Sequence, residues 1–202
     1  MRQEPGGGGG GGGGGLNHQQ QSVFDLMKQT LQSWGLGSLV GDLRKLIVQG
    51  DTATDTLALA LSQTQAYKKR FAGNEVRVKN GLPELTPAQY IATEEQYQNV
   101  LRSYGLPQGF YDQHTDFVKL IGNDVSPTEL DTRAKIAHDY YTAAPAAEKQ
   151  LWQQYGFSKG DVIAGILDPK VATQVIQDRA NEIALGGAGL AQGFHVTEKR
   201  AR

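Results

Sequence analysis

The sequence predicts an all-α protein, an irregular bundle of about seven to eight short helices that follows a disordered, glycine-rich N-terminal leader. Three observations support this fold class. Apolar residues recur at spacings of three and four over most of the chain. N-capping residues, prolines and glycines mark the ends of many of these segments. Residues 6–15 are an unbroken glycine run, which has no side chain to bury.

The pattern divides the chain into three parts. Residues 1–21 are predicted to be a disordered leader, because the glycine run continues into a polar stretch over residues 17–21. Residues 22–185 are predicted to form one helical domain. Residues 186–202 are predicted to be a flexible tail that is first glycine-rich and then charged.

The first part of the domain is predicted to contain three helices. Apolar residues from Val23 to Trp34 follow helical spacing, and Gly35 stands where a C-terminal cap is expected. A second helix fits residues 39–48 and ends at Gly50. A third is expected to continue as far as Phe71, with one apolar face.

Residues 72–85 break this pattern and are predicted to form a long loop. The interrupting residues are Gly73, Asn80-Gly81 and Pro83. Val76 and Val78 alternate with charged residues, so a short strand is the alternative, although it would have no partner strand.

The later helices have clear start signals. Thr86-Pro87-Ala88-Gln89 and Ser126-Pro127-Thr128-Glu129 are typical of capping boxes with proline at the first helical position. Further helices are expected from Pro145 to Gly156 and over 161–167, and a last one, capped by Asp168-Pro169, would continue to Gly186. An aromatic–glycine–apolar triplet ends three helices, at 34–36, 104–106 and 155–157, and predicts the Schellman motif at each.

Composition excludes several classes of function. The chain has 20 basic and 21 acidic residues and a net charge of −1, which argues against a protein built wholly to bind polyanions. It has no cysteine, so thiol nucleophiles, disulfide frameworks and zinc ribbons are excluded. The longest apolar-rich stretch, at 57–61, is far too short to span a membrane, and the N-terminus lacks the features of a secretory signal.

Few residues suggest catalysis or metal binding, and no cofactor is expected. Glu94 falls within an apolar stripe marked by Tyr90 and Tyr97, where a carboxylic acid could serve as the general acid of a glycan-cleaving enzyme. A structural glutamate paired at the edge of the stripe explains the same position. Residues 112–116 alternate carboxylates with a histidine but fail the EF-hand pattern, so we interpret them as caps of a following helical turn.

One basic concentration could contact nucleic acid or a protein partner. Its members are Lys68, Lys69, Arg70, Arg77 and Lys79. Tyr67 and Phe71 flank the first three, but their spacing of four places both on the predicted apolar face. A solvated helix face with cations near its C-terminus therefore explains the same residues.

The central part of the chain contains a distinctive series of short motifs. The most distinctive are Gly81-Leu82-Pro83, Gly105-Leu106-Pro107 and Asp124-Val125-Ser126-Pro127, which stand among similar segments at 67–71, 109–112, 155–157 and 167–169. Over residues 32–193 this series resembles a helical domain of virion-associated structural proteins of tailed bacteriophages, often called minor tail proteins. The pattern departs from the family after Phe194, where a further apolar helix is expected. The chain is therefore either shorter than its relatives or one segment of a longer protein.

The resemblance implies a non-enzymatic structural or interaction protein of a bacteriophage particle. It would contact other virion proteins, and the formation of a homo-oligomer is a further possibility. Its expected location is the virion, which is assembled in the host cytoplasm. Two alternatives stay open from the residues themselves: a glycan-cleaving domain that uses Glu94, and a nucleic-acid-binding helical protein that uses the basic residues from Lys68 to Lys79.

Overall fold

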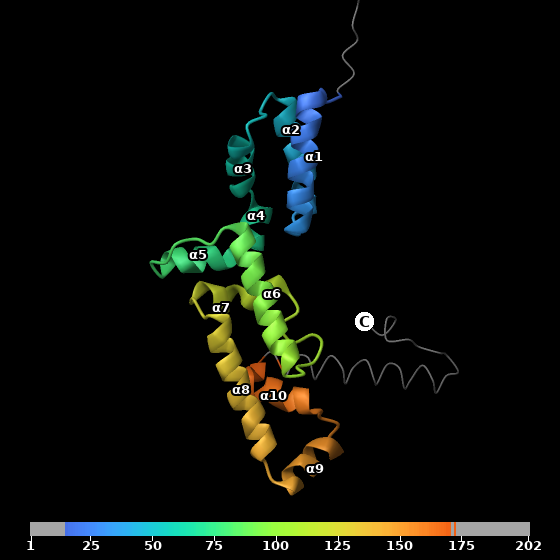
Figure 1. Cartoon of the computed structure of the whole chain (residues 1–202), viewed down its shortest axis with the longest axis vertical. Helices are drawn as coiled ribbons and strands as arrows, with labels where there is room; N and C mark the ends of the chain where they lie inside the picture. Colours follow the sequence, from blue (N-terminus) through green and yellow to red (C-terminus); the bar gives the residue numbers. More distant parts are fainter. Residues whose placement is uncertain (1–14, 171, 173–202) are drawn as a thin grey trace, which may run out of the picture. The chain divides into compact units, whose positions relative to one another are not determined.

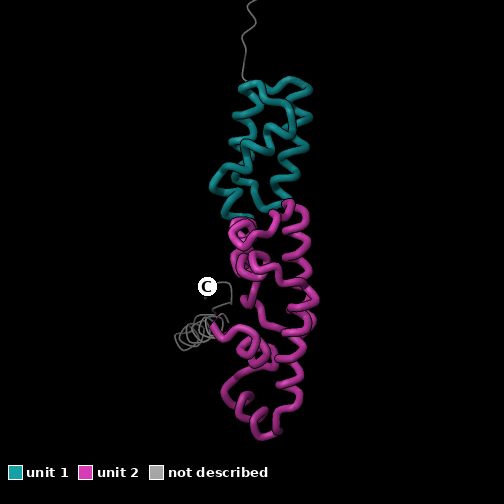
Figure 2. Tube along the Cα trace, turned by 90° about the vertical axis from the view of Figure 1, so that its left-hand side faces the viewer, with its two compact units in different colours: residues 1–71 teal, residues 72–202 magenta. Residues whose placement is uncertain are grey.

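The all-α prediction is confirmed. A computed structural model describes residues 15–170 and Ala172, and within these residues there are ten α-helices, two 3-10 helices and no strand (Figure 1). The helices are shorter and more numerous than predicted. The chain divides into two compact units, residues 1–71 and 72–202, where the sequence predicted a single helical domain (Figure 2).

The first unit contains α1 (His18–Ser33), η1 (Gly37–Leu39), α2 (Val40–Val48), α3 (Thr54–Ser62) and α4 (Gln65–Arg70). Helix α1 lies against α2, and α2 lies against α3. The side chains between them are apolar and buried; they include Phe24, Leu31, Leu39, Leu43, Ile47, Leu57 and Leu61. The Gln20 side chain also donates to the Ile47 carbonyl at 3.0 Å, which links the start of α1 to the end of α2.

Two predicted boundaries in this unit are wrong. Helix α1 begins at His18, four residues before the predicted start, because Asn17 and Gln20 form a reciprocal capping box that satisfies the first turn. The predicted third helix is two helices. The Thr64 hydroxyl accepts a hydrogen bond from the Tyr67 amide and so starts α4, which a threonine inside one continuous helix would not do. Residues 1–14 of the predicted leader lie outside the described residues.

The second unit contains the remaining helices. They are α5 (Ala72–Lys79), α6 (Pro87–Ser103), η2 (His114–Phe117), α7 (Val118–Gly122), α8 (Pro127–Ala143), α9 (Ala146–Gln154) and α10 (Lys159–Leu167). Helix α5 packs on α7, and α8 packs on both α6 and α10. The largest fully buried side chains of the second unit are Tyr90, Tyr97, Phe110, Phe117, Leu101, Ile121 and Ile163.

Helix α5 occupies most of the segment that was predicted to be a loop. The glycine that suggested a break, Gly73, is inside the helix because nothing larger fits there: a Cβ atom would stand 2.7 Å from the Tyr90 hydroxyl oxygen. Val76 lies in this helix and not in the short strand that was the alternative. It packs against Gly122 of α7, where an added Cβ would stand 2.5 Å from the Val76 Cβ atom. Tertiary packing therefore overrides the local signals.

The helix ends predicted at the three aromatic–glycine–apolar triplets are confirmed. At Gly35, Gly105 and Gly156 the backbone is left-handed, with φ of 74°, 72° and 78°. Each following residue donates back to the carbonyl five positions earlier, as in Leu36 to Leu31 at 2.7 Å, which is the Schellman pattern. The Thr86 capping box is also confirmed. At Ser126 only half of the predicted box forms: the Ser126 hydroxyl accepts from the Glu129 amide at 3.1 Å, whereas the Glu129 carboxylate pairs with Arg133. These signals are local, so the sequence predicts them well.

The predicted last helix and the tail after it lie outside the described residues, apart from the first residues of that helix. Its cap is described: the Asp168 carboxylate accepts from the Lys170 amide at 3.1 Å. None of the helices in the described part of the chain is long and apolar enough to span a bilayer.

Candidate functional site

The five candidate basic residues are divided between the two units. Lys68, Lys69 and Arg70 are on α4 in the first unit, whereas Arg77 and Lys79 are on α5 in the second. Arg70 donates from Nε to the Trp34 carbonyl at 2.8 Å and lies 5.1 Å from the centre of the Phe71 ring. Lys79 pairs with Glu75 one turn away at 2.7 Å, with both side chains exposed. Lys68 and Lys69 are exposed.

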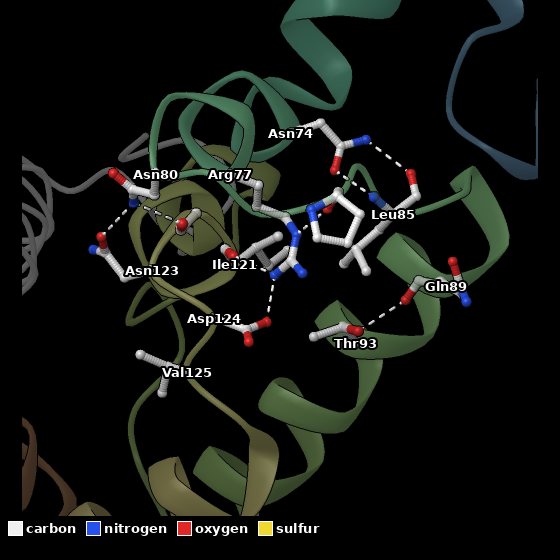
Figure 3. A network of polar contacts seen from close by, with 12 residues as sticks. Asn74, Arg77, Asn80, Leu85, Gln89, Thr93, Ile121, Asn123, Asp124 and Val125 are labelled. Carbon is white, nitrogen blue, oxygen red and sulfur yellow. Dashed lines mark hydrogen bonds and ion pairs between the residues drawn. The ribbon is translucent and has the colours of Figure 1, made fainter.

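Arg77 was predicted to be a contact residue for nucleic acid or a partner, and this prediction is wrong. Its side chain is only 7% exposed. It stands four residues after Gly73, so both lie on the helix face that packs against α7. Its guanidinium donates to the carbonyls of Pro83 at 2.9 Å and Ile121 at 3.1 Å, and it pairs with Asp124 at 2.5 Å (Figure 3). We call these four residues the Arg77 network.

The network explains an unusual backbone conformation. Asp124 has φ of 56°, at the position of a Schellman motif where glycine is the usual residue. A non-glycine residue in this conformation costs about 1–2 kcal/mol. The charge-assisted hydrogen bond from Arg77 offsets that cost. The guanidinium also donates to the loop carbonyl of Pro83 and adds a donor to the Ile121 carbonyl, which already accepts from the Asp124 amide.

Two asparagines extend these contacts along α5. Asn74 exchanges hydrogen bonds with the Leu85 backbone at 2.8 and 3.0 Å, and Asn80 donates to the Gly122 carbonyl at 3.0 Å (Figure 3). The buried Tyr97 hydroxyl of α6 donates to the Val125 carbonyl, next to Asp124. Burial, and secondarily the negative charge of Asp124, raise the pKa of Tyr97 to about 12. The hydroxyl is therefore a permanent donor at neutral pH.

Glu94 lies in the buried stripe of α6, and its side chain is 4% exposed. Its Oε2 atom is 3.3 Å from Nδ1 of His114, whose side chain is 58% exposed at the start of η2. The sequence placed His114 in a metal-like cluster and did not connect it to Glu94, because twenty positions separate the two. The structure therefore brings together a buried carboxylate and an exposed imidazole.

One carboxylate of the metal-like cluster is a cap: Asp116 accepts from the Gln113 amide at 2.9 Å at the start of η2. Asp112 instead accepts from the Gly109 amide at 2.5 Å in the preceding loop and pairs with Arg102. The interpretation of residues 112–116 as capping residues is therefore confirmed for Asp116 and not for Asp112. Within the described ranges, no three histidine, aspartate or glutamate side chains are grouped as metal ligands would be.

The α8–α9 hairpin differs from the rest of the second unit. No residue of α9 is buried. Trp152 stacks on Tyr141 of α8, with ring centres 5.3 Å apart, and the Lys149 ammonium donates to the Thr142 carbonyl at 2.8 Å. Four large apolar side chains of the hairpin face solvent: Ile136, Tyr140, Leu151 and Tyr155. This exposure was not predicted, because apolar residues at helical spacing usually indicate a buried face.

No protein family model, no curated protein and no solved structure matches this chain.

Proposed function

We propose that the chain is a non-enzymatic structural and interaction protein of a bacteriophage particle, in contact with other virion proteins. The resemblance to phage virion proteins supports the class. The observation that carries the interaction role is the exposed apolar surface of the α8–α9 hairpin, where Leu151 and Tyr155 are 51% and 76% exposed. Fully burying a wholly exposed side chain of this kind is favourable by about 1.5–3 kcal/mol, and the half-exposed Leu151 would gain only part of this on association.

The composition of the hairpin suits a protein interface. Tyrosine and tryptophan are enriched among the residues that dominate binding energy. Here two exposed tyrosines accompany an exposed isoleucine and an exposed leucine on one helical hairpin. In contrast, the charged candidates Arg77 and Asp112 are engaged in contacts within the unit. The hairpin is therefore the part of the second unit best suited to contact another protein.

Mass spectrometry of purified particles tests this proposal. Particles of the phage that encodes the chain would be banded on a density gradient, and their proteins quantified against the lysate. We expect the chain to copurify with the capsid and tail proteins at a constant ratio. A chain that stays in the soluble lysate, like a phage replication enzyme measured in the same samples, would contradict the proposal.

Glycan cleavage is the second candidate, favoured by the contact between buried Glu94 and His114. Such an enzyme requires a second carboxylate about 5–10 Å from the first. The test is release of reducing ends from purified bacterial cell wall by the wild-type protein and by Glu94→Gln. Activity that is lost in Glu94→Gln would establish the enzyme and overturn a non-enzymatic role. We expect no release by either protein.

A further inference from the structure

Helix α9 presents one uncharged stripe to solvent. Ala147, Leu151 and Tyr155 are spaced by four and so lie along one side of the helix and its C-cap, and all three are exposed. The neighbouring Trp152 points toward α8, where it stacks on Tyr141. We call the three exposed residues the α9 stripe.

We propose that the α9 stripe binds the α9 stripe of a second copy of the chain, with the two helices antiparallel around a two-fold axis at Leu151. The proposal deepens the function proposed above, because it names one partner of the hairpin. In such a pair each residue meets the residue of the partner that lies equally far from Leu151 on the other side.

The sizes of the side chains fit this arrangement. Antiparallel pairing about Leu151 places the large Tyr155 of one copy over the small Ala147 of the other, at both ends of the contact. Leu151 meets Leu151 at the centre. A large side chain over a small one lets two helices approach within the usual 8–10 Å between axes, whereas a parallel pair would set Tyr155 against Tyr155 at one end and leave a gap between two alanines at the other.

The charges also permit self-pairing. No residue of the α9 stripe is charged, and the two charged residues of α9, Glu148 and Lys149, are both half-buried. Lys149 is engaged within the hairpin by the Thr142 carbonyl and the Tyr141 ring. The antiparallel register places Glu148 opposite Gln154, so no like charges oppose each other. A contact of this size is weak in isolation and suits assemblies in which many copies add their contacts.

The absence of cysteine from the chain makes a disulfide test direct. Leu151→Cys places one thiol at the proposed two-fold axis, where two Cα atoms of paired helices can reach the separation of about 4.4–6.8 Å that a disulfide requires. The matched control is Leu59→Cys, because Leu59 is also an exposed leucine within a helix. Leu59 is 65% exposed, and Leu151 is 51% exposed. We expect Leu151→Cys to form disulfide-linked dimers under mild oxidation several times faster than Leu59→Cys. Equal rates would overturn the proposal.

A mixture of Ala147→Cys and Tyr155→Cys tests the antiparallel register. With one variant carrying a longer tag, the mixed disulfide is a separate band on a non-reducing gel. Random pairing of equal concentrations makes the mixed band equal to the sum of the two homodimer bands, and the proposal predicts a mixed band well above that sum. A mixed band at or below the sum, as random collision or a parallel pair would give, would contradict the proposal. Circular dichroism confirms that each variant is folded. Because purified protein is used, failure here would leave the test on phage particles unaffected.

Discussion

The Arg77 network and the α8–α9 hairpin belong to the same unit but use their residues in opposite ways. In the network a charged side chain is buried and bonded to two carbonyls and a carboxylate. In the hairpin leucine and tyrosine face solvent on a helix with no buried residue. The comparison indicates that one region stabilises the fold, whereas the other leaves apolar side chains exposed to solvent, which is why we propose it as the interaction surface.

Arg77→Ala is expected to have the largest effect. It removes the donor of the Pro83 carbonyl and one of the donors of the Ile121 carbonyl, and it ends the ion pair with Asp124, whose side chain is 60% exposed. The loss of these buried hydrogen bonds is expected to cost about 1–3 kcal/mol. Urea unfolding measures this, with Trp152 as the reporter of the second unit in a Trp34→Phe background. Lys79→Ala, on the exposed side of α5, is the control and should cost about 0.5 kcal/mol or less. Equal effects of the two variants would show that the network does not stabilise the unit.

Gly122→Ala is expected to have the next largest effect. The new Cβ atom would stand 2.5 Å from Val76, so α5 and α7 must separate, at a cost of about 1–3 kcal/mol. Gly165→Ala on α10 is the control, since nothing lies within 4 Å of its added Cβ atom. It should raise stability by about 0.5 kcal/mol, because alanine favours helix. Differential scanning calorimetry measures both, and a Gly122→Ala protein as stable as wild type would show that the packing is loose.

The Tyr97 hydroxyl is expected to make stability pH-dependent. Because burial raises its folded pKa from 10.0 to about 12, the folded state keeps this proton over a range in which the unfolded chain loses it. The contribution is therefore fully present below pH 10 and is lost as pH rises toward 12. The urea concentration at the unfolding midpoint should decrease more between neutral pH and about pH 11 for the wild type than for Tyr97→Phe. Parallel pH profiles for the two proteins would contradict this assignment.

Leu151→Ser in the hairpin is expected to have the smallest effect on stability, about 0.5 kcal/mol or less, because its side chain already contacts water. Urea unfolding of the monomer at low concentration measures it. Leu101→Ser, which changes a leucine of α6 that is 1% exposed, is the matched buried control and should cost several times more. A loss of similar size at Leu151 would show that the hairpin belongs to the core and would remove the contrast between the regions.

The parts of the fold that the sequence predicts are those decided within one helical turn. The Thr86 capping box and the left-handed glycines at the aromatic corners depend only on neighbouring residues, and they are where the pattern indicated. Helix α5 was missed because Gly73 is a helix breaker by propensity and is accommodated only by its distant contact with Tyr90.

The candidate site could be predicted only in part, for the same reason. Arg77 is near other cations in sequence, but its ion-pair partner is Asp124, 47 positions away. One local signal was available: Asp124 follows the last turn of α7 at a position that favours glycine or asparagine. The contact of Glu94 with His114 and the exposure of α9 depend on how helices pack, which spacing along one helix does not determine.

Cross-linking mass spectrometry on purified phage particles tests the central claim most directly. An amine-reactive cross-linker would be used, and the cross-links to other chains would be counted at two groups of lysines. The first group is in the hairpin region (Lys135, Lys149 and Lys159), and the second is near the Arg77 network (Lys79 and Lys119). We predict that the chain is present in the particles and that its links to other chains, including second copies of itself, are concentrated at the hairpin lysines. A chain absent from the particles, or linked to other chains mainly through Lys79 and Lys119, would contradict this account.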